Sequence, residues 1–300
     1  MIIDAHSHLW LSQDTVVDGQ PIRTTTRGRS IFFGEEVQMI PPFLYDGRNC
    51  AEAFIANMDY AQVNAAVVVQ EFIDGLQNDY LADVAARWPE RFKVCGMADW
   101  RKPGFLQQAI TLIESGSYSG MAIPGHRLPS PLDSPEFMQV YSLMEQKGLF
   151  LSLCLHKDNH QLPEVEHIIA EHPALKIAIG HFGMVTSEGW LEQIKLARHR
   201  NVMIESGGIT WLFNREFHPY PSAVRAIRQA ADMVGIEKLM WGSDYPRTIT
   251  AITYRMSYDF IAKSPALTDG EKRLFLGENA RRFYGFGDFE EIPYIKNMSE

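Results

Sequence analysis

The sequence has few cysteines and no long apolar segment. Its 300 residues include three cysteines, Cys50, Cys95 and Cys154, which form no C-x-x-C pair and no disulfide framework. That pattern fits a reducing cytoplasm. No apolar run reaches the roughly 18 residues of a membrane span, and the opening MIIDAHSHLW lacks the basic and apolar segments of a secretory signal. We therefore expect a cytoplasmic protein that does not enter a membrane.

Positive charge and glycine-rich phosphate loops are also scarce. Lys and Arg number 28 against 37 Asp and Glu, which makes the formal net charge −9. Because phosphate backbones attract basic proteins, we expect no nucleic-acid partner. What the chain does have is the composition of a globular protein, with 46% hydrophobic and 22% charged residues, and an excess of histidine, ten in all.

Short β-type runs alternate with amphipathic helical segments along the chain. Several runs are apolar throughout, such as AAVVV and LFLSLCL, which is typical of parallel strands covered on both faces. We expect strands at residues 2–5, 65–69, 92–98, 118–123, 149–155, 174–179, 201–205 and 238–241. This alternation predicts a distorted (β/α)₈ TIM barrel, formed as a single domain over residues 1–300. An open doubly wound sheet is the alternative, but no glycine-rich phosphate fingerprint follows any of the runs.

The helices between these strands carry recognisable start and stop signals. Pro103 and Pro135 are expected in first turns, Gly148 just past a helix end, and Thr268 as an N-cap. The helical segments are expected near 50–63, 81–88, 103–113, 135–148, 164–171, 188–198, 222–233, 250–262 and 268–284.

Two stretches interrupt this rhythm. Residues 11–48 are rich in Thr, Gly, Pro and Arg, and a loop of that length in a compact domain is usually functional. Because it follows the first strand, we interpret it as a lid or substrate-binding insertion at the barrel mouth, followed by the rest of the barrel and a C-terminal helix. The closing residues 285–300 carry the apolar side chains Phe286, Phe289, Ile292 and Tyr294, which predict packing against the barrel or against a second subunit and make a homodimer the candidate assembly.

Four histidines and one aspartate directly follow predicted strands. His6 and His8 follow the first strand, His156 the fifth, His181 the sixth and Asp244 the eighth. Catalytic groups of a barrel lie at the C-terminal ends of its strands, and residues i and i+2 of an extended segment face the same side. Imidazole and carboxylate ligands suit Zn²⁺ or another divalent transition metal. The alternative for any one of these residues is a satisfied core or surface side chain.

The other histidines and Cys154 carry weaker signals. His126 and His218 follow strands on the expected active face and are candidate neighbours of the site. A solvated role is expected for His160, His167, His172 and His199, which lie in or beside helices. Cys154 is either a nucleophile or a small buried hydrophobic residue, and its apolar surroundings favour the second.

These motifs resemble the metal-dependent amidohydrolase superfamily, in particular its amidohydrolase-2 branch. The matching stretches are IIDAHSHLW, ALKIAIGHFG, KLMWGSDYP and GENARRFYGF, in that order over nearly the whole chain. The resemblance implies one divalent metal at the barrel mouth, with Zn²⁺ favoured and Mn²⁺ as the alternative. It implies His6, His8, His156 and Asp244 as metal ligands, with His181 contacting substrate or metal. The fourth strand ends in AIPGHR, without a lysine to be carbamylated, which argues for a mononuclear site.

The branch contains two main chemistries acting on small-molecule substrates. The segments VVVQ and NDYLADVAARWPERFKVCGMADW resemble its lactonases, which implies hydrolysis of a sugar or carboxylated lactone. Non-oxidative decarboxylation or hydration of an aromatic or unsaturated acid is the alternative. A metal-free binding protein on the same barrel is a third hypothesis from a different class.

For a lactonase, Asp244 is expected to act as general base and then general acid, beside a metal that lowers the pKa of bound water. His181 is expected to donate a hydrogen bond to the substrate carbonyl. Arg127 and Arg247 are expected to hold a carboxylate or hydroxyl in a forked contact, with a solvated surface role as the alternative. The pocket walls are expected from Trp10, Gln70 and Trp211, although a core role is the alternative for Trp10.

Overall fold

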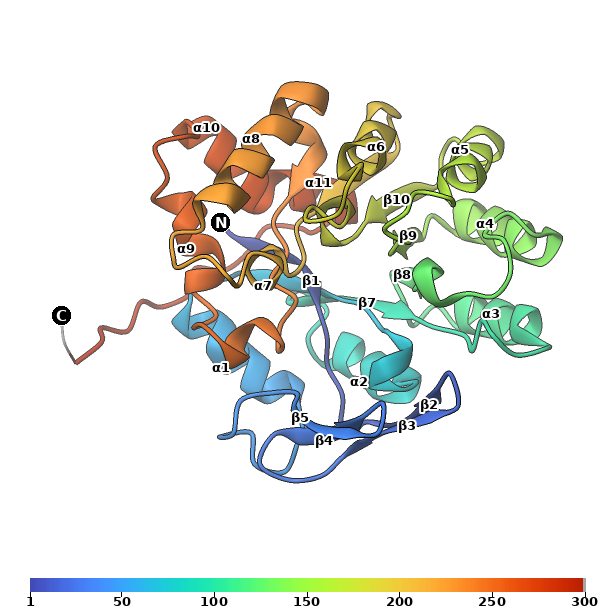
Figure 1. The fold of residues 1–300 in the computed structure, drawn as a ribbon, viewed down its shortest axis with the longest axis horizontal. Helices are drawn as coiled ribbons and strands as arrows, with labels where there is room; N and C mark the ends of the chain where they lie inside the picture. The colour runs from blue at the N-terminus through green and yellow to red at the C-terminus, as the bar shows by residue number, and fades with distance from the viewer. Residues whose placement is uncertain (299–300) are drawn as a thin grey trace.

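Eight parallel strands form the centre of the computed structural model, which describes residues 1–298 (Figure 1). Each strand pairs with the next along the chain, and helices surround the sheet, so the predicted (β/α)₈ barrel is confirmed. The strands are β1 (Ile3–Ser7), β6 (Ala65–Val68), β7 (Phe92–Gly96), β8 (Gly120–Ile123), β9 (Phe150–Leu153), β10 (Lys176–Ile179), β11 (Val202–Glu205) and β12 (Leu239–Met240).

Backbone hydrogen bonds join β1 to the segment that follows β12. The Ala5 amide donates to the Trp241 carbonyl at 2.9 Å, and the Asp244 amide donates to the His6 carbonyl at 2.9 Å. The pairing of β1 with β6 also shifts between Asp4 and Ser7, which is a β-bulge. A bulge re-aims the side chains at and beyond it, and this one contains His6 and lies just before His8.

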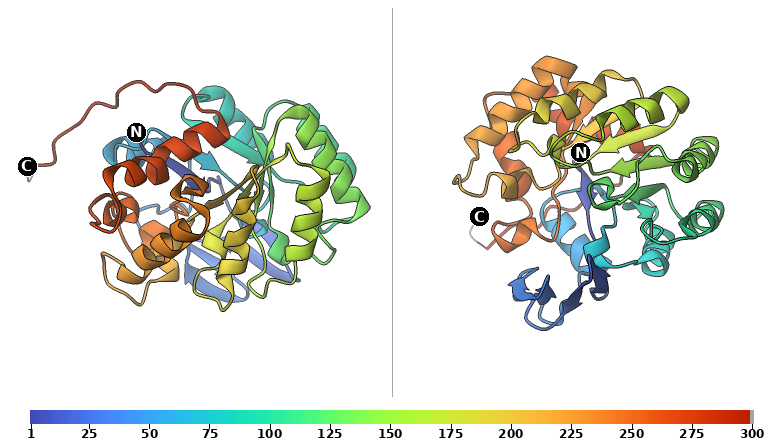
Figure 2. Two further views of the ribbon diagram at one scale, coloured as in Figure 1. Left: turned by 90° about the horizontal axis from the view of Figure 1, so that it is seen from above. Right: turned by 45° about the vertical axis from the view of Figure 1, so that its right-hand side comes forward.

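Helices cover the outside of the barrel, as the view from above shows (Figure 2). They are α1 (Ala51–Tyr60), α2 (Asn78–Arg87), α3 (Phe105–Glu114), α4 (Pro135–Lys147), α5 (Leu162–Glu171), α6 (Trp190–Lys195), α7 (Ile209–Leu212), α8 (Pro221–Val234), α9 (Met256–Ala262), α10 (Asp269–Arg273) and α11 (Asn279–Tyr284). Among the helices of residues 1–298, none is long and apolar enough to cross a membrane.

The predicted helix signals are mostly confirmed. Pro135 lies in the first turn of α4, Gly148 ends it with φ 71°, and Thr268 forms a capping box with Glu271. The prediction for Pro103 is wrong, because α3 begins at Phe105, after a left-handed Gly104. The last two predicted helices are interrupted: α9 begins only at Met256, and a π-helical turn separates α10 from α11.

The insertion 11–48 is a small sheet rather than a long irregular loop. Its antiparallel strands are β2 (Asp14–Val17), β3 (Gln20–Thr24), β4 (Arg29–Phe32) and β5 (Glu35–Gln38). The dipeptide Asp18-Gly19 supplies the two left-handed residues of a tight hairpin, a signal that composition alone does not reveal. Val17 and Ile22 join the main hydrophobic core, and the sheet lies on the side of α1 and α2 (Figure 1).

The C-terminal segment begins against the barrel and then leaves it. Phe286 is buried in the cluster that includes Phe283 and Tyr284, and Phe289 packs against the same cluster. The predicted packing against the barrel is therefore confirmed for these two phenylalanines. Farther on, Ile295 is 80% exposed, and the chain extends outward (Figures 1 and 2). Residues 299–300 lie outside the described part, and the homodimer remains a prediction.

Buried Asp4 connects the first and last strands of the barrel. Its carboxylate accepts hydrogen bonds from the Ser243 amide at 2.8 Å, the Ser243 hydroxyl, the Tyr254 hydroxyl at 2.8 Å and the His6 amide at 3.1 Å. Burial raises the pKa of Asp4 to about 6, although these donors oppose the rise. The carboxylate thus fixes the backbone on both sides of the barrel mouth.

We expect Asp4→Ala to lower the free energy of unfolding by about 3 kcal/mol or more, because several buried donors lose their acceptor. Urea-induced unfolding measures the loss. The control is Asp14→Ala, which removes an exposed carboxylate paired with Arg23 and should change stability by less than about 0.5 kcal/mol. Equal stabilities for the two variants would contradict this role of Asp4.

Candidate active site

A cavity of about 360 Å³ opens at the C-terminal ends of the strands. All predicted site residues except Trp10 line it. Trp10 is 1% exposed, donates its indole N–H to the Gly47 carbonyl at 3.0 Å, and packs with Met39 and Ile40. The substrate-contact prediction for Trp10 is therefore wrong, because its ring is buried beneath the insertion instead of facing the cavity. The lining contains no residue of 11–48 within the part of the chain that the structure describes.

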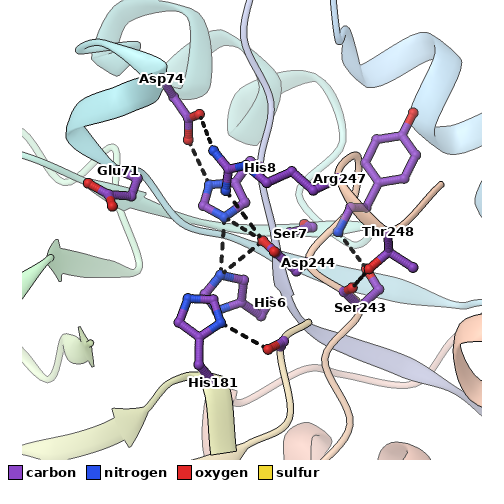
Figure 3. Close-up of polar contacts among 12 residues, drawn as sticks. His6, Ser7, His8, Glu71, Asp74, His181, Ser243, Asp244, Arg247 and Thr248 are labelled. Atoms are coloured by element: carbon purple, nitrogen blue, oxygen red, sulfur yellow. Dashed lines mark hydrogen bonds and ion pairs between the residues drawn. The ribbon is translucent and has the colours of Figure 1, made fainter. Parts of the chain in front are cut away.

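His6, His8 and Asp244 converge on one point of the cavity floor (Figure 3). The Nε2 atoms of the two imidazoles are 3.1 Å apart. Asp244 Oδ1 lies 3.1 Å from His8 Nε2 and 3.7 Å from His6 Nε2. The three side chains come from the first and eighth strands, so the i, i+2 interpretation of His6 and His8 is confirmed.

Two carboxylates hold these imidazoles from behind. Glu205 Oε1 is 2.7 Å from His6 Nδ1, and Asp74 Oδ2 is 2.8 Å from His8 Nδ1 (Figure 3 shows the Asp74 contact). When both rings are neutral and carry their proton on Nδ1, the lone pairs of the two Nε2 atoms point toward each other and toward Asp244. Asp244 Oδ1 has no hydrogen-bond donor among residues 1–298, while Oδ2 accepts from the Trp211 indole at 2.6 Å. Three converging electron-pair donors of this kind fit a divalent cation.

The charges around this point also favour a cation. Asp74, Glu205 and Asp244 are buried, and Arg247 is the cation beside them, with Nη2 2.9 Å from Asp74 Oδ1. Burial lowers the pKa of His8, but Asp74 and Asp244 outweigh it and raise that pKa to about 9. Burial raises the pKa of Asp244, yet His8 and Arg247 hold it well below its usual range. The arrangement therefore favours positive charge, and a metal ion bound here would compete with a proton for His8 Nε2.

Two glycines make room for the His6–Glu205 pair. A Cβ atom on Gly207 would lie 2.7 Å from both His6 Cγ and Glu205 Oε2. A Cβ atom on Gly242 would lie 2.8 Å from His6 Cβ. Such contacts are far inside van der Waals distance, so glycine at both positions allows the carboxylate to reach the imidazole.

His181 lies beside His6 but presents a different hydrogen-bonding face. Its Nδ1 is 2.9 Å from the Gly207 carbonyl oxygen, which can only accept, so Nδ1 carries the proton. Burial and the neighbouring His6 lower the pKa of His181. The neutral ring therefore offers an acceptor at Nε2. Donation to a substrate carbonyl from Nε2 requires the doubly protonated ring, and that predicted role of His181 stays a prediction.

His156 reaches the cavity without joining the His6–His8–Asp244 group. Its Nδ1 is 2.9 Å from Asp158 Oδ1, because the chain turns back after β9 and places that carboxylate beside the ring. The predicted ligand set is thus corrected: the structure assembles three of the four proposed ligands.

The remaining predicted contacts are engaged with other parts of the barrel. Arg127 Nε pairs with Glu71 Oε2 at 2.7 Å, and Arg247 pairs with Asp74, so each arginine lines the cavity with part of its charge balanced. Gln70 donates to the Cys95 carbonyl and to Asn78, and is 4% exposed. Its contacts support the loop after β6 as well as the cavity wall.

The weaker expectations have mixed outcomes. His126 lines the cavity and lies 3.4 Å from Glu71, which confirms it as a neighbour of the site, whereas His218 lines a separate pocket. His172 is buried beside Glu145, so its predicted solvated role is wrong. Cys154 lines the cavity and is only partly buried, which corrects the prediction of a buried side chain. Desolvation nevertheless raises the pKa of its thiol well above the usual range, which disfavours a nucleophilic role.

Sequence reasoning missed Asp74, Glu205 and Glu71. A positional signal existed, since Glu205 ends the strand NVMIE, and Glu71 and Asp74 follow the strand AAVVV in QEFID. In this barrel the carboxylates that orient the histidines follow strand ends just as the histidines do, so acidic residues at strand ends are part of the same signal.

This barrel and its mouth define the class: a (β/α)₈-barrel enzyme with a His/Asp site at the C-terminal end of the strands. The amidohydrolase family model matches residues 3–286, and the chain therefore belongs to the amidohydrolase family, in the branch that its motifs resemble. An L-fucono-1,5-lactonase of Burkholderia ambifaria is 26% identical over 257 residues, covering 81% of this chain and 80% of the relative.

Solved structures share the fold. A probable 2-pyrone-4,6-dicarboxylic acid hydrolase from Acinetobacter baumannii, with citric acid bound, has a TM-score of 0.70 at 19% identity, covering 95% of this chain and 99% of that one. A zinc-bound amidohydrolase from Burkholderia multivorans has a TM-score of 0.69 at 20% identity, covering 96% and 100%. A manganese-bound 5-carboxyvanillate decarboxylase from Novosphingobium aromaticivorans has a TM-score of 0.57 at 17% identity, covering 78% and 81%.

We expect Glu205→Gln to weaken divalent-cation binding by about 10- to 100-fold, because the amide cannot accept from both His6 Nδ1 and the Gly207 amide, as the carboxylate does. Competition with a chromogenic chelator measures the affinity. The matched control is Glu166→Gln, which alters an exposed carboxylate 2.8 Å from His199 and should leave the affinity unchanged. Wild-type affinity in Glu205→Gln would show that the carboxylate does not support the site.

Proposed function

We propose that this chain is a metal-dependent lactonase that opens a sugar or carboxylated lactone. The observation that carries this proposal is the convergence of His6 Nε2, His8 Nε2 and Asp244 Oδ1 at the floor of the cavity. The 26% identical relative is a lactonase, and the Acinetobacter protein is a probable 2-pyrone-4,6-dicarboxylic acid hydrolase. The three free cysteines agree with a cytoplasmic setting.

His6, His8 and Asp244 would hold the ion, for which Zn²⁺ is favoured and Mn²⁺ is the alternative. When bound, a divalent cation supplies a Lewis acid that polarises the ester carbonyl and lowers the pKa of water to about 7. Related folds carry zinc in the Burkholderia multivorans protein and manganese in the decarboxylase. Availability decides between ions for a donor set of this type.

Asp244 would transfer the protons, and His181 would orient the attacking water. Asp244 stays ionised at neutral pH because His8 and Arg247 lower its pKa, and the Trp211 indole fixes its Oδ2. It accepts the proton of the attacking water and returns it to the alkoxide that leaves when the ring opens. His181 Nε2 accepts a hydrogen bond from the water and orients it, since the neutral ring keeps its donor at Nδ1 for Gly207.

The cavity walls would orient the lactone. Arg127 and Arg247 line the cavity, and each balances a carboxylate while keeping further N–H donors for a substrate carboxylate or hydroxyl. Trp211 lies beside His181, with ring centroids 6.0 Å apart, and shields the proton-transfer groups from water.

Decarboxylation of an aromatic or unsaturated acid is the second candidate. It is favoured by the fold shared with 5-carboxyvanillate decarboxylase and by a cavity wall that includes Val69, Ile73 and Leu155. The same ion would then bind the substrate carboxylate, and an acid would protonate the ring carbon.

A substrate screen separates the two candidates. We expect acid release from sugar or carboxylated lactones, followed in a pH-stat, and no CO₂ from hydroxybenzoates or unsaturated dicarboxylates. Asp244→Asn should lower kcat by about 10²-fold or more while the fold is kept. The control is Asp232→Asn, at an exposed carboxylate paired with Arg228, which should retain activity. CO₂ release without lactone opening would establish the second candidate instead.

We expect a chelator to abolish turnover and Zn²⁺ or Mn²⁺ to restore it. The physical reason is that His6, His8 and Asp244 place electron pairs against each other, which only a cation or a proton relieves. Element analysis of the same samples links activity to bound metal. Full activity in a chain shown to be metal-free would remove the ion from the reaction.

A further inference from the structure

A second group of metal-binding side chains lies at the rim of the cavity. His156, Asp158 and His160 each offer one ligand atom, and the three atoms lie within 4.8 Å of one another. Asp158 Oδ1 is 2.9 Å from His156 Nδ1 and 2.5 Å from His160 Nδ1. We call these three residues the rim group. It repeats the donor set of the central site, two imidazoles and one carboxylate, on a single turn of chain.

The backbone of this turn is fixed by buried side chains. The Gln161 side chain accepts from the His156 amide at 2.9 Å and donates to the Gly125 carbonyl at 2.9 Å. The Gln193 side chain donates to the His156 carbonyl at 2.9 Å and to Asn159 at 3.0 Å. Both glutamines are buried. These bonds fix the backbone of the turn at His156 without an ion, which lowers the entropic cost of binding one.

The rim group differs from the other surface histidine–carboxylate pairs of the chain. His167 faces Asp133, and His199 faces Glu166, one imidazole to each carboxylate. In the rim group two imidazoles share one carboxylate oxygen, with ring centroids 5.2 Å apart. For both rings to donate to that oxygen, each Nδ1 must carry a proton, and its lone pair is then not available to a ligand. A metal ion, by contrast, is bound by the two Nδ1 lone pairs and the carboxylate together.

We infer that His156, Asp158 and His160 form a second, solvent-facing site for a divalent transition-metal ion such as Zn²⁺ or Co²⁺, independent of the central site. Nitrogen and carboxylate donors in a ratio of two to one are typical of such ions and leave further coordination positions for water or a ligand. Because His156 and Lys157 line the cavity, an ion here lies at its entrance. This assignment does not depend on the lactonase proposal.

The test measures how much Co²⁺ the full chain binds, by equilibrium dialysis after chelator treatment and by visible absorption. Wild type should bind about two equivalents, and His160→Ala, Asp158→Asn and His156→Ala about one. The matched control, His167→Ala, removes an equally exposed histidine with a carboxylate partner and should still bind about two. His8→Ala should lose the central equivalent and keep the one at the rim.

Two results would overturn the inference. One is a wild-type stoichiometry near one that His160→Ala leaves unchanged. The other is loss of the central equivalent in His156→Ala, which would place His156 with His6 and His8 instead. Because the readout is bound metal rather than turnover, neither result is confused with failure of the lactonase assay. Circular dichroism verifies that each variant is folded, which is expected since His160 and Asp158 are exposed.

Discussion

The meeting of His6 Nε2, His8 Nε2 and Asp244 Oδ1 is the constraint on which the rest of the site depends. Electron pairs this close, out of water, are tolerated only if positive charge lies among them. The barrel brings them together by hydrogen-bonding β1 to the segment after β12 and by a bulge between Asp4 and Ser7. The Asp4 carboxylate strengthens the same junction, because it accepts hydrogen bonds from both β1 and the segment after β12. Barrel closure and formation of the site are thus one structural event.

Hydrogen-bond acceptors at the barrel mouth set the orientation of the three imidazoles. Asp74 and Glu205 favour a proton on the Nδ1 atoms of His8 and His6, so that Nε2 of each ring faces Asp244. The Gly207 carbonyl does the same for His181. Arg247 limits the negative charge without neutralising it, since it faces both Asp74 and Asp244. A divalent ion would complete this balance, and the rim group offers the same kinds of donor nearer to solvent.

The strands were predictable because a strand covered on both faces must be apolar throughout, as AAVVV shows. Helix ends at Pro135, Gly148 and Thr268 were predictable because each depends on local backbone chemistry. The sheet in 11–48 was not, because its strands are short and half exposed, so that alternation is weak and composition resembles a loop. Helix α9 begins at Met256, later than predicted, because the loop after Asp244 takes up the residues expected in its first turns.

The sequence by itself determined the donors of the site, since the strand pattern places His6, His8, His181 and Asp244 at ends that a barrel must bring together. Only the tertiary structure decided which carboxylates orient them and which histidine stays outside. His6 and Glu205 are 199 residues apart, and nothing local links them. His156 turns to Asp158 because its own loop supplies a nearer partner. Residue position along a strand is a local property, whereas the direction and tautomer of an imidazole depend on contacts between distant segments.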